Sequence, residues 1–422
     1  MSTQASALSH LKVLDLSRVL AGPWCTQMLA DLGADVIKVE RPGAGDDTRH
    51  WGPPFLQDAE GVDTDQATYF TACNRNKRAI TLDMAHPEGQ ALIRQMAAQS
   101  DVLVENFKVG GLKQYGLDYA SLKEINPRLI YCSVTGFGQN GPYAERAGYD
   151  LMIQAMSGMM SITGRADDQP GGGPMRMGVA LIDILTGIYA TSAVLAAIES
   201  RHQSGQGQHI DMALLDVGMA VLANQAAGFL NSGKVPQRQG NTHPSLAPYQ
   251  TFATLDGSML LAIGNDGQFA RFCNAADHAE WAQDTRFASN TLRVKNREAL
   301  IALMLTVTRT RSTADWISLL EDKAVPCGPI NDIAQAFADP QALARGLIVK
   351  QPVAQTNKAM KATHNVVPVV NIHTVASPLR LTGTPPVLRH APPSLGQHTD
   401  EVLAELGLTQ ARIDALHAQG VL

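Results

Sequence analysis

A carboxylate beside a segment of small residues is the first candidate for chemistry. Asp183 lies within Met175–Ala190, between an apolar run and residues that can form a helix. Because Asp is preferred at helix N-caps, we expect a helix from Asp183 to about Arg201. The unpaired N–H groups and dipole at such a terminus keep a partly buried carboxylate ionised, which makes it a usable nucleophile. A simple capping role would explain the same residue.

Motifs for other kinds of chemistry do not occur in the sequence. There is no HExxH, P-loop or GxSxG pattern, and none of the 12 histidines has a partner at helical ligand spacing. We therefore expect no catalytic metal. Five separated cysteines without a CxxC pair argue against a disulfide framework. We interpret them as reduced core thiols of a cytoplasmic protein: Cys25, Cys73, Cys132, Cys273 and Cys327.

Length and charge restrict the possible partners. A chain of 422 residues with 45% hydrophobic residues can form two or three domains. Its net charge of −5 and pI near 6.2 give no basic field for nucleic acid, so an anionic ligand must be held by local groups. The first residues lack the features of a signal peptide, and the apolar run 187–198 is too short to span a bilayer. These features predict a soluble protein that does not bind a membrane.

The N-terminal half predicts an α/β fold with an open, parallel, Rossmann-like sheet. A strand at 11–16, a helix at 23–32 and a strand at 35–40 form a βαβ unit. Further strands are expected at 79–82, 102–105 and 129–134, with a helix at 87–98. A dinucleotide site is disfavoured because the first turn, Val19–Pro23, has no GxGxxG pattern, although Glu40 is placed to bind a ribose.

Ligands of such sheets collect at the carboxyl ends of the strands. The residues expected there are Arg18 to Ala21, Arg41, Asp83 to Ala85, Asn106 to Lys108, and Thr135 to Gly138.

Composition suggests four regions along the chain. Residues 1–205 form the large sheet domain, and residues 206–236 form a linker. Residues 237–329 form a smaller α+β domain around a hairpin at Asp256-Gly257, which is a strong turn signal. Residues 330–422 form a proline-rich return that ends in helices packed on the large domain.

Several runs of sequence resemble one enzyme family. They are Leu14–Pro23, Leu32–Arg41, Asn74–Arg78, Val104–Phe107 and Gly396–Thr399. In this order they resemble the class III CoA-transferases, of the formyl-CoA and carnitine CoA-transferase type, from about Leu11 to Leu422. The resemblance implies that Asp183 is the nucleophile, that CoA is bound as a substrate thioester, and that the enzyme is an interlocked homodimer.

The resemblance also assigns the CoA site to the strand-end loops. Val19, Leu20 and Ala21 would hold the adenine end, and Arg41 would reach the nucleotide phosphates, which the planar guanidinium suits. The rest would be lined by Leu82, Asp83, Met84, Ala85, Asn106, Phe107, Lys108, Thr135, Gly136, Phe137 and Gly138. One departure is Thr135, which stands where formyl-CoA transferases have a lysine.

Two other activities stay open at this point. The α-methylacyl-CoA racemases share this resemblance but use a histidine in a Gly-His-Asp motif, where this chain has Gly148-Tyr149-Asp150. A phenol with a pKa of about 10 replaces imidazole poorly in proton transfer, so the transferase is favoured. A non-catalytic CoA-binding protein is the second alternative.

Three segments are most similar to enzymes that use succinyl-CoA and dicarboxylates such as glutarate: Glu40–Phe55, Arg146–Asp150 and His243–Tyr249. Sulfinate analogues of dicarboxylates are conceivable acceptors. The candidates to bind a second acidic group are Arg18, Arg49, Tyr149, Arg176 and His243. The expected mechanism is covalent, through Asp183, with oxyanion donors in the loops Gly171–Gly173 and Gly240–Thr242 and without a redox cofactor.

Overall fold

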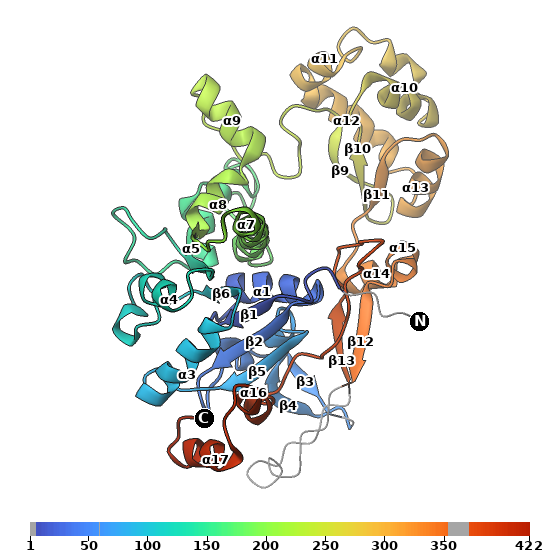
Figure 1. Ribbon diagram of the computed structural model, residues 1–422. Helices are drawn as coiled ribbons and strands as arrows, with labels where there is room; N and C mark the ends of the chain where they lie inside the picture. Colours follow the sequence, from blue (N-terminus) through green and yellow to red (C-terminus); the bar gives the residue numbers. More distant parts are fainter. Residues whose placement is uncertain (1–5, 59, 353–370) are drawn as a thin grey trace. The chain divides into compact units, whose positions relative to one another are not determined.

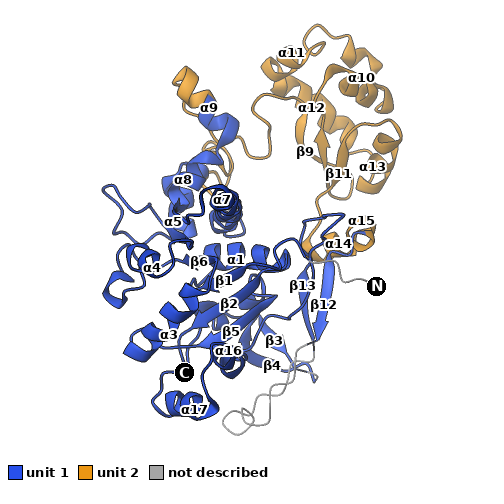
Figure 2. Cartoon of the chain, viewed as in Figure 1, with its two compact units in different colours: residues 1–159, 177–227, 345–422 blue, residues 160–176, 228–344 orange. Residues whose placement is uncertain are grey.

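The computed structural model describes residues 6–58, 60–352 and 371–422, which form two compact units (Figures 1 and 2). Unit 1 comprises residues 1–159, 177–227 and 345–422, and unit 2 comprises residues 160–176 and 228–344. Part of the predicted proline-rich return, residues 353–370, lies outside the described residues.

Unit 1 is built on a six-stranded sheet in the order β5-β2-β1-β6-β7-β8, in which all neighbouring strands are parallel. This confirms the predicted parallel α/β class. The strand order reverses between β1 and β6, which is where ligands of such sheets bind. The strands are β1 (Lys12–Asp15), β2 (Asp35–Glu40), β5 (Lys77–Thr81), β6 (Val102–Glu105), β7 (Ile130–Thr135) and β8 (His209–Ala213).

Alternating apolar side chains bury both faces of the sheet. Val102 and Val104 of β6 pack on one face, in a core that includes side chains of α1 (Ala21–Asp31) and α7 (Leu181–Ser204). Leu103, between them in sequence, packs on the other face. That second core includes α3 (Pro87–Ala98), α16 (Thr399–Glu405) and α17 (Gln410–Ala418). The C-terminal helices therefore complete the core of unit 1.

Shorter elements complete unit 1. Two antiparallel pairs are β3 (Phe55–Gln57) with β4 (Asp63–Ala67) and β12 (Ile348–Pro352) with β13 (Asn371–Val375). The short helices are α2 (Thr68–Thr71), α4 (Tyr119–Ile125), α5 (Asp150–Met156) and α8 (Leu214–Ala220). The helices α6 (Met159–Ile162) and α9 (Ala223–Ser232) cross between the units. Because β8 and α8 belong to the sheet unit, the predicted linker at 206–236 is largely part of unit 1.

Unit 2 contains a three-stranded antiparallel sheet, β11-β10-β9, with helices around it. Its strands are β9 (Tyr249–Ala253), β10 (Ser258–Ala262) and β11 (Cys327–Pro329). The predicted hairpin at Asp256-Gly257 joins β9 and β10. Its helices are α10 (Asp266–Ala275), α11 (Asn290–Lys295), α12 (Arg297–Thr308), α13 (Thr313–Asp322), α14 (Ile333–Ala338) and α15 (Pro340–Ala344). The unit also includes residues 160–176 and 330–344, which the sequence had assigned elsewhere.

The helix α7 is long and apolar enough, by composition alone, to cross a membrane. Packing explains much of the apolar composition of α7, since Ile182, Val194 and Ile198 lie in the same core as residues of α1. Its Arg201 is also buried, where it pairs with Asp101 at 2.9 Å. We therefore interpret α7 as a core helix.

Candidate active site

Asp183 lies in the first turn of α7, but it does not begin the helix as predicted. The helix starts at Leu181, Ala180 is the N-cap, and the last residue is Ser204 rather than Arg201. Asp183 is thus the third helical residue. Within the described part of the chain its carboxylate accepts no hydrogen bond, so the capping explanation for this aspartate does not hold.

Another aspartate caps this helix. One carboxylate oxygen of Asp150 accepts the backbone N–H groups of Ile182 at 2.7 Å and Asp183 at 3.2 Å. Its other oxygen accepts from Nε2 of the buried Gln154 at 2.5 Å, and Oε1 of Gln154 accepts the N–H of Met177 at 2.9 Å. Through these bonds, Asp150 and Gln154 of α5 hold the backbone at Met177, before α7, and the backbone of the first turn of α7.

The surroundings of Asp183 make it a weak acid. Burial, followed by the negative charge of Asp150, raises the pKa of Asp183 from an ordinary 3.8 to about 7. Asp183 is therefore about half protonated at pH 7, less ionised than expected from the helix terminus alone, because burial and the Asp150 charge oppose its ionisation. A carboxylate of this kind is more basic when ionised, and such shifts are common among catalytic groups.

Tyr69 of α2 lies close enough to the same two carboxyl groups for their charges to act on it. Burial raises the pKa of Tyr69 to about 12, and the charges of Asp183, Cys73 and Asp150 add to the effect. The phenol therefore stays protonated and can donate a hydrogen bond near Asp183. Trp51 packs against its ring edge to face, with 5.4 Å between ring centroids. Sequence reasoning missed Tyr69, because nothing in its local pattern links a residue of a four-residue helix to Asp183.

A glycine lets α7 approach the loop that follows β1. A Cβ atom at Gly187, one turn after Asp183, would lie 2.8 Å from the carbonyl oxygen of Ala21 and 2.8 Å from Cβ of Trp24. Real Cβ atoms essentially never make contacts this short, so any larger residue would force α7 or the loop to move. The turn of α7 next to Asp183 therefore rests on the predicted CoA-binding loop.

Buried charges hold this loop in place. Lys38 Nζ donates to the carbonyl of Ser17 at 2.8 Å and to Asp46 at 2.9 Å. Asp46 in turn accepts the N–H of Val19 at 3.2 Å, and Val19 has a left-handed backbone with φ of 72°. Beneath them, Lys77 pairs with Asp15 at 3.0 Å. Because two buried cations match two buried anions, the network can fix the loop without leaving an unpaired charge.

The loops after β1 and β6 meet across the point where the strand order reverses. The backbone N–H of Arg18 donates to Asn106 Oδ1 at 2.9 Å, and Asn106 Nδ2 donates to the carbonyl of Arg18 at 2.7 Å. The Arg18 guanidinium lies 5.4 Å from the centroid of the Phe107 ring and pairs with Asp47 at 3.0 Å. The structure thus brings two of the predicted CoA-binding loops together.

The loop after β7 lies beside the segment that carries Asp150. The backbones of Gly136 and Gly148 pack so closely that a Cβ on Gly136 would lie 2.5 Å from the Gly148 Cα. Thr135, which replaces the family lysine, accepts the N–H of Gly138 at 3.0 Å and so shapes the turn. Phe137 is buried in the same core as Ile182.

The other predicted CoA-binding residues follow β2, β5 and β6. Arg41 follows β2 directly and is exposed, as a phosphate-binding residue must be before its ligand arrives. Leu82 is buried, Met84 is partly buried and Ala85 is exposed. The N–H of Asp83 donates to the carbonyl of Val421 at 2.8 Å, so this loop packs on the C-terminal segment. Lys108 is exposed beside Phe107.

The five candidates for a second acidic group differ in availability. Arg49 is buried, makes two bonds of 2.7 Å to Glu40 and stacks 3.6 Å from the Phe70 centroid. Its guanidinium is fully engaged, so we no longer assign it to substrate. Arg18 is partly engaged by Asp47. Tyr149 is 67% exposed, while Arg176 and His243 belong to unit 2.

The glycine loops expected to supply oxyanion donors also belong to unit 2. Most of their N–H groups already donate to backbone carbonyls, namely Gly172 to Gln169, Gly173 to Arg165, Gly240 to Gly164 and Thr242 to Gln239. They are therefore poor candidates for oxyanion donors, and the expectation is corrected. Tyr69, in the same unit as Asp183, is a better one.

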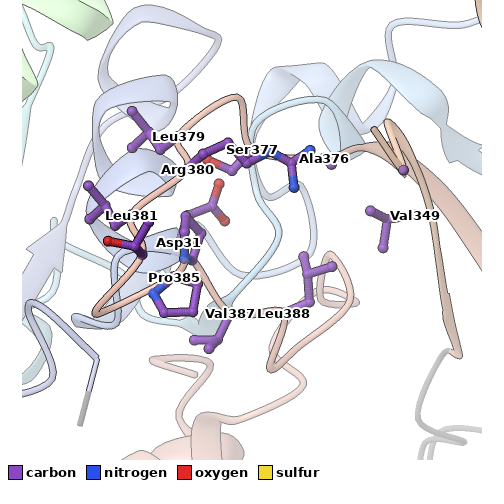
Figure 3. A pocket seen from close by; sticks show the side chains of 13 residues that line it. Asp31, Val349, Ala376, Ser377, Leu379, Arg380, Leu381, Pro385, Val387 and Leu388 are labelled. Atoms are coloured by element: carbon purple, nitrogen blue, oxygen red, sulfur yellow. The ribbon is translucent and has the colours of Figure 1, made fainter. Parts of the chain in front are cut away.

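A separate pocket of about 330 Å³ lies in unit 1 (Figure 3). Most of its labelled side chains are apolar, including Val349, Leu379 and Leu388. Its one carboxylate, Asp31, pairs with Arg75 at 2.5 Å. It contains none of the predicted site residues. Within the described ranges, no cluster of three or more His, Cys, Asp or Glu side chains could hold a metal.

Known proteins match this chain along nearly its whole length. The sequence profile of CoA-transferase family III matches residues 8–399. A succinate–glutarate CoA-transferase of Agrobacterium fabrum is 50% identical over 406 residues, which are 96% of this chain and 97% of that protein. The human succinyl-CoA:glutarate CoA-transferase is 42% identical, over 94% of this chain and 86% of that protein. A solved CAIB/BAIF family protein from Brucella suis has a TM-score of 0.82 and 49% identity, covering 96% of this chain and 100% of that one.

Proposed function

Because this chain belongs to CoA-transferase family III, we propose that it transfers CoA from succinyl-CoA to glutarate, with Asp183 as the nucleophile. The substrate pair is supported by the 50% identity to a succinate–glutarate CoA-transferase over almost the full length of both proteins. The role of Asp183 is supported by its partly exposed place in the first turn of α7, next to the β1 loop.

The first half-reaction converts the Asp183 side chain into a thioester. The carboxylate attacks the thioester carbonyl of succinyl-CoA, which forms a mixed anhydride and releases the CoA thiolate. The thiolate then attacks the aspartyl carbonyl of the anhydride, so that succinate leaves and an aspartyl-CoA thioester remains. Each step exchanges one acyl bond for another and needs no redox cofactor.

The second half-reaction runs in reverse with the acceptor. A carboxylate of glutarate attacks the aspartyl-CoA thioester, which forms a new anhydride and releases the thiolate again. Attack of the thiolate on the glutaryl carbonyl gives glutaryl-CoA and restores Asp183. The protonated hydroxyl of Tyr69 is suited to stabilise the negative oxygen of these tetrahedral intermediates.

The proposal includes the quaternary structure: two chains form the interlocked homodimer that the family resemblance implies. Along α7, Ile188, Tyr189 and Leu195 are exposed by 38%, 45% and 36%. Exposed apolar side chains on one helix are typical of a protein interface. Light scattering should give twice the chain mass, and an Ile188→Asp, Leu195→Asp double variant should shift the mass toward one chain. A wild-type mass equal to that of one chain would contradict the dimer.

A cytoplasmic location stays part of the proposal, supported by the five free thiols.

Chemical trapping tests the covalent step. The enzyme is incubated with succinyl-CoA, treated with hydroxylamine or borohydride, and digested for mass spectrometry. Modification of the peptide containing Asp183 is expected, together with loss of transfer in Asp183→Asn. The control is Asp414→Asn on α17, whose carboxylate bonds only Gln410 among the contacts described. Modification at another residue, or full activity of Asp183→Asn, would refute the assignment.

Incubation in deuterated water separates the transferase from the racemase. A racemase would exchange the α-proton of a 2-methylacyl-CoA without an acceptor acid, whereas a transferase needs the acceptor. A protein that binds CoA without catalysis would leave both substrates unchanged.

A further inference from the structure

Glu105 is a buried acid that the proposed mechanism does not use. It is the last residue of β6, and only 6% of its surface is exposed. Within the described part of the chain, four other acids are buried at least as deeply, and each of them pairs with a lysine or an arginine. Glu105 makes no ion pair among the contacts of the described residues. Because burying an unpaired carboxylate is costly, hydrogen bonds from its neighbours must replace the lost water.

Two hydrogen bonds hold the Glu105 carboxylate. Its Oε2 accepts the backbone N–H of Phe107 at 2.8 Å. The hydroxyl of Ser133, which lies opposite Glu105 on β7, donates the second bond. Burial raises the pKa of Glu105 to about 7, and the two bonds oppose this rise because they stabilise the ionised form. At about pH 8 the group is therefore mostly ionised and can only accept hydrogen bonds.

His209 of β8 orients the Ser133 hydroxyl. Its Nε2 lies 2.9 Å from Ser133 Oγ. Since Ser133 gives its single proton to Glu105, its oxygen accepts from the Nε2–H of His209, which fixes the tautomer of the ring. The imidazole packs in turn against the rings of Tyr119, stacked at 5.1 Å, and Tyr131, edge-on at 5.6 Å. A line of hydrogen bonds across β8, β7 and β6 therefore fixes the direction of the Glu105 carboxylate.

The bond to Phe107 shapes the turn at the carboxyl end of β6. Asn106, in the middle of this turn, exchanges two hydrogen bonds with the backbone of Arg18, whose guanidinium lies over the Phe107 ring. The turn lies where the strand order reverses, which is where ligands of parallel sheets bind. Arg18 and Lys108 are exposed cations beside a partly buried aromatic ring. This combination suits the phosphates and the adenine of CoA.

We propose that Glu105 is a positioning residue for acyl-CoA, whose carboxylate holds the backbone of residues 106–108 in the shape that receives the CoA part of the substrate. The inference rests on the proposed function and adds a residue that acts through the binding loop without touching the reacting atoms. The contacts that connect it to the nucleophile's helix all lie in unit 1. The loop bonds the Arg18 backbone, and the carbonyl of Ala21, three residues further along, packs on Gly187 of α7.

A matched pair of variants tests whether a hydrogen-bond acceptor is what this position needs. Glu105→Gln keeps an oxygen for the Phe107 N–H, whereas Glu105→Met has nearly the same length and no acceptor. At about pH 8, Glu105→Met should raise both the Kd for CoA, measured by calorimetric titration, and the KM for succinyl-CoA about 10-fold, the lower end of the range for loss of a charge-assisted hydrogen bond. Its kcat and its KM for glutarate should change little, and Glu105→Gln should stay within about 3-fold of the wild type. The control is Glu124→Met, at an exposed position of α4, which should bind CoA like the wild type.

Hydrogen exchange followed by mass spectrometry separates positioning from a general loss of structure. In Glu105→Met, the peptide containing Phe107 should lose protection, while the peptides of β1 and β7 stay as protected as in the wild type. A general structural role would instead increase exchange throughout the sheet and lower kcat with an unchanged KM. If Glu105→Met does not fold, Ser133→Ala takes its place, because it removes only the second bond to Glu105 and should raise the Kd for CoA about 3-fold.

Three results would overturn the inference. They are an unchanged Kd for CoA in Glu105→Met, or in Ser133→Ala where that variant replaces it; an equal loss of affinity in Glu105→Gln and Glu105→Met; and a weaker affinity without faster exchange at Phe107. Titration with CoA needs no turnover, so a wild type that binds CoA but does not transfer it to glutarate would refute the proposed function and leave this test intact. Transfer to glutarate with equal CoA affinity in all variants would leave the proposed function standing without the inference. A wild type that does not bind CoA would overturn both.

Discussion

Asp150 accepts the backbone N–H of Asp183 through one of its carboxylate oxygens, at 3.2 Å. This contact has two opposite consequences for Asp183. It fixes the first turn of α7, and it brings a second negative charge to a carboxyl group whose pKa burial already raises; together the two effects raise the pKa of Asp183 to about 7. A residue that positions the nucleophile therefore also contributes to the pH at which it is ionised.

The first prediction concerns pH. Ionised Asp183 is the attacking form, so transfer should rise with pH and reach half its maximum near the Asp183 pKa of about 7. The measurement is kcat/KM for succinyl-CoA from about pH 5.5 to about pH 8.5. Ionisation of Tyr69 should not affect kcat/KM in this pH range, because the pKa of Tyr69 is about 12. A profile that is flat across neutral pH would contradict the assignment.

The second prediction removes the charge of Asp150 and keeps an acceptor. Asp150→Asn can still accept the N–H groups of Ile182 and Asp183, but it no longer repels negative charge on Asp183. The pKa of Asp183 should fall, so the rising limb of the pH profile should move to lower pH. The Tm should also fall, because the Asn amide nitrogen would face the Gln154 Nε2 donor that now bonds Asp150. Asp150→Ala, which also removes the cap, should cost about 0.5–2 kcal/mol of stability. If the limb of Asp150→Asn stays at the wild-type pH, the charge of Asp150 does not set the ionisation of Asp183.

The third prediction concerns stability. Since the folded pKa of Asp183 is about 7 and its ordinary value is 3.8, the folded state binds the proton more tightly. The resulting stability is fully present below the ordinary value and is lost as pH rises through the folded one. Asp183→Asn should therefore be more stable than the wild type at pH 8, by about 2 kcal/mol after allowance for partial exposure. Urea titrations should show the difference at pH 8 and its disappearance at about pH 4. A variant less stable than the wild type at pH 8 would oppose this argument.

The sheet and its binding edge could be predicted because their signals are local. Apolar runs such as residues 102–104 are buried on both faces, and the carboxyl ends of β6 and β7 place Asn106 and Thr135 at one edge. The βαβ order at the N-terminus then implies parallel strands. Asp183 was found for a different reason, since a carboxylate near the start of an apolar helix is visible in the sequence itself.

The features that were missed depend on contacts between residues far apart in the chain. The cap of α7 comes from Asp150, so a capping rule applied to neighbouring residues misplaced the helix start. Arg49 has the type of a substrate-binding residue, but Glu40 binds it inside the core. The boundary of unit 2 was missed because residues 163–175 bond to Gly240 through the backbone, which composition does not reveal.

The fourth prediction concerns the contact between α7 and the β1 loop. Gly187→Ala would place a methyl group 2.8 Å from the Ala21 carbonyl oxygen, so α7 or the loop must move. We expect a loss of about 1–3 kcal/mol in stability and a higher KM for succinyl-CoA. Gly228→Ala is the control, because that helical position has open space around it and alanine favours helix. Equal stability and KM in Gly187→Ala and the wild type would show that the contact is not needed.

The fifth prediction isolates one hydroxyl group. Tyr69→Phe keeps the ring that packs edge to face on Trp51 and removes only the phenol hydroxyl, whose pKa the charge of Asp183 raises. If that donor stabilises the tetrahedral intermediates, kcat should fall about 100-fold, while the KM for succinyl-CoA and the Tm stay close to wild type. A structural role alone would instead lower Tm and leave kcat nearly unchanged. Tyr115→Phe, on the other side of the sheet, should match the wild type in both. Because aspartyl-CoA forms before the acceptor enters, rapid-quench measurement of its formation should show the same loss as steady-state transfer. A slow second half-reaction with normal formation of the aspartyl thioester would place Tyr69 at acceptor attack alone.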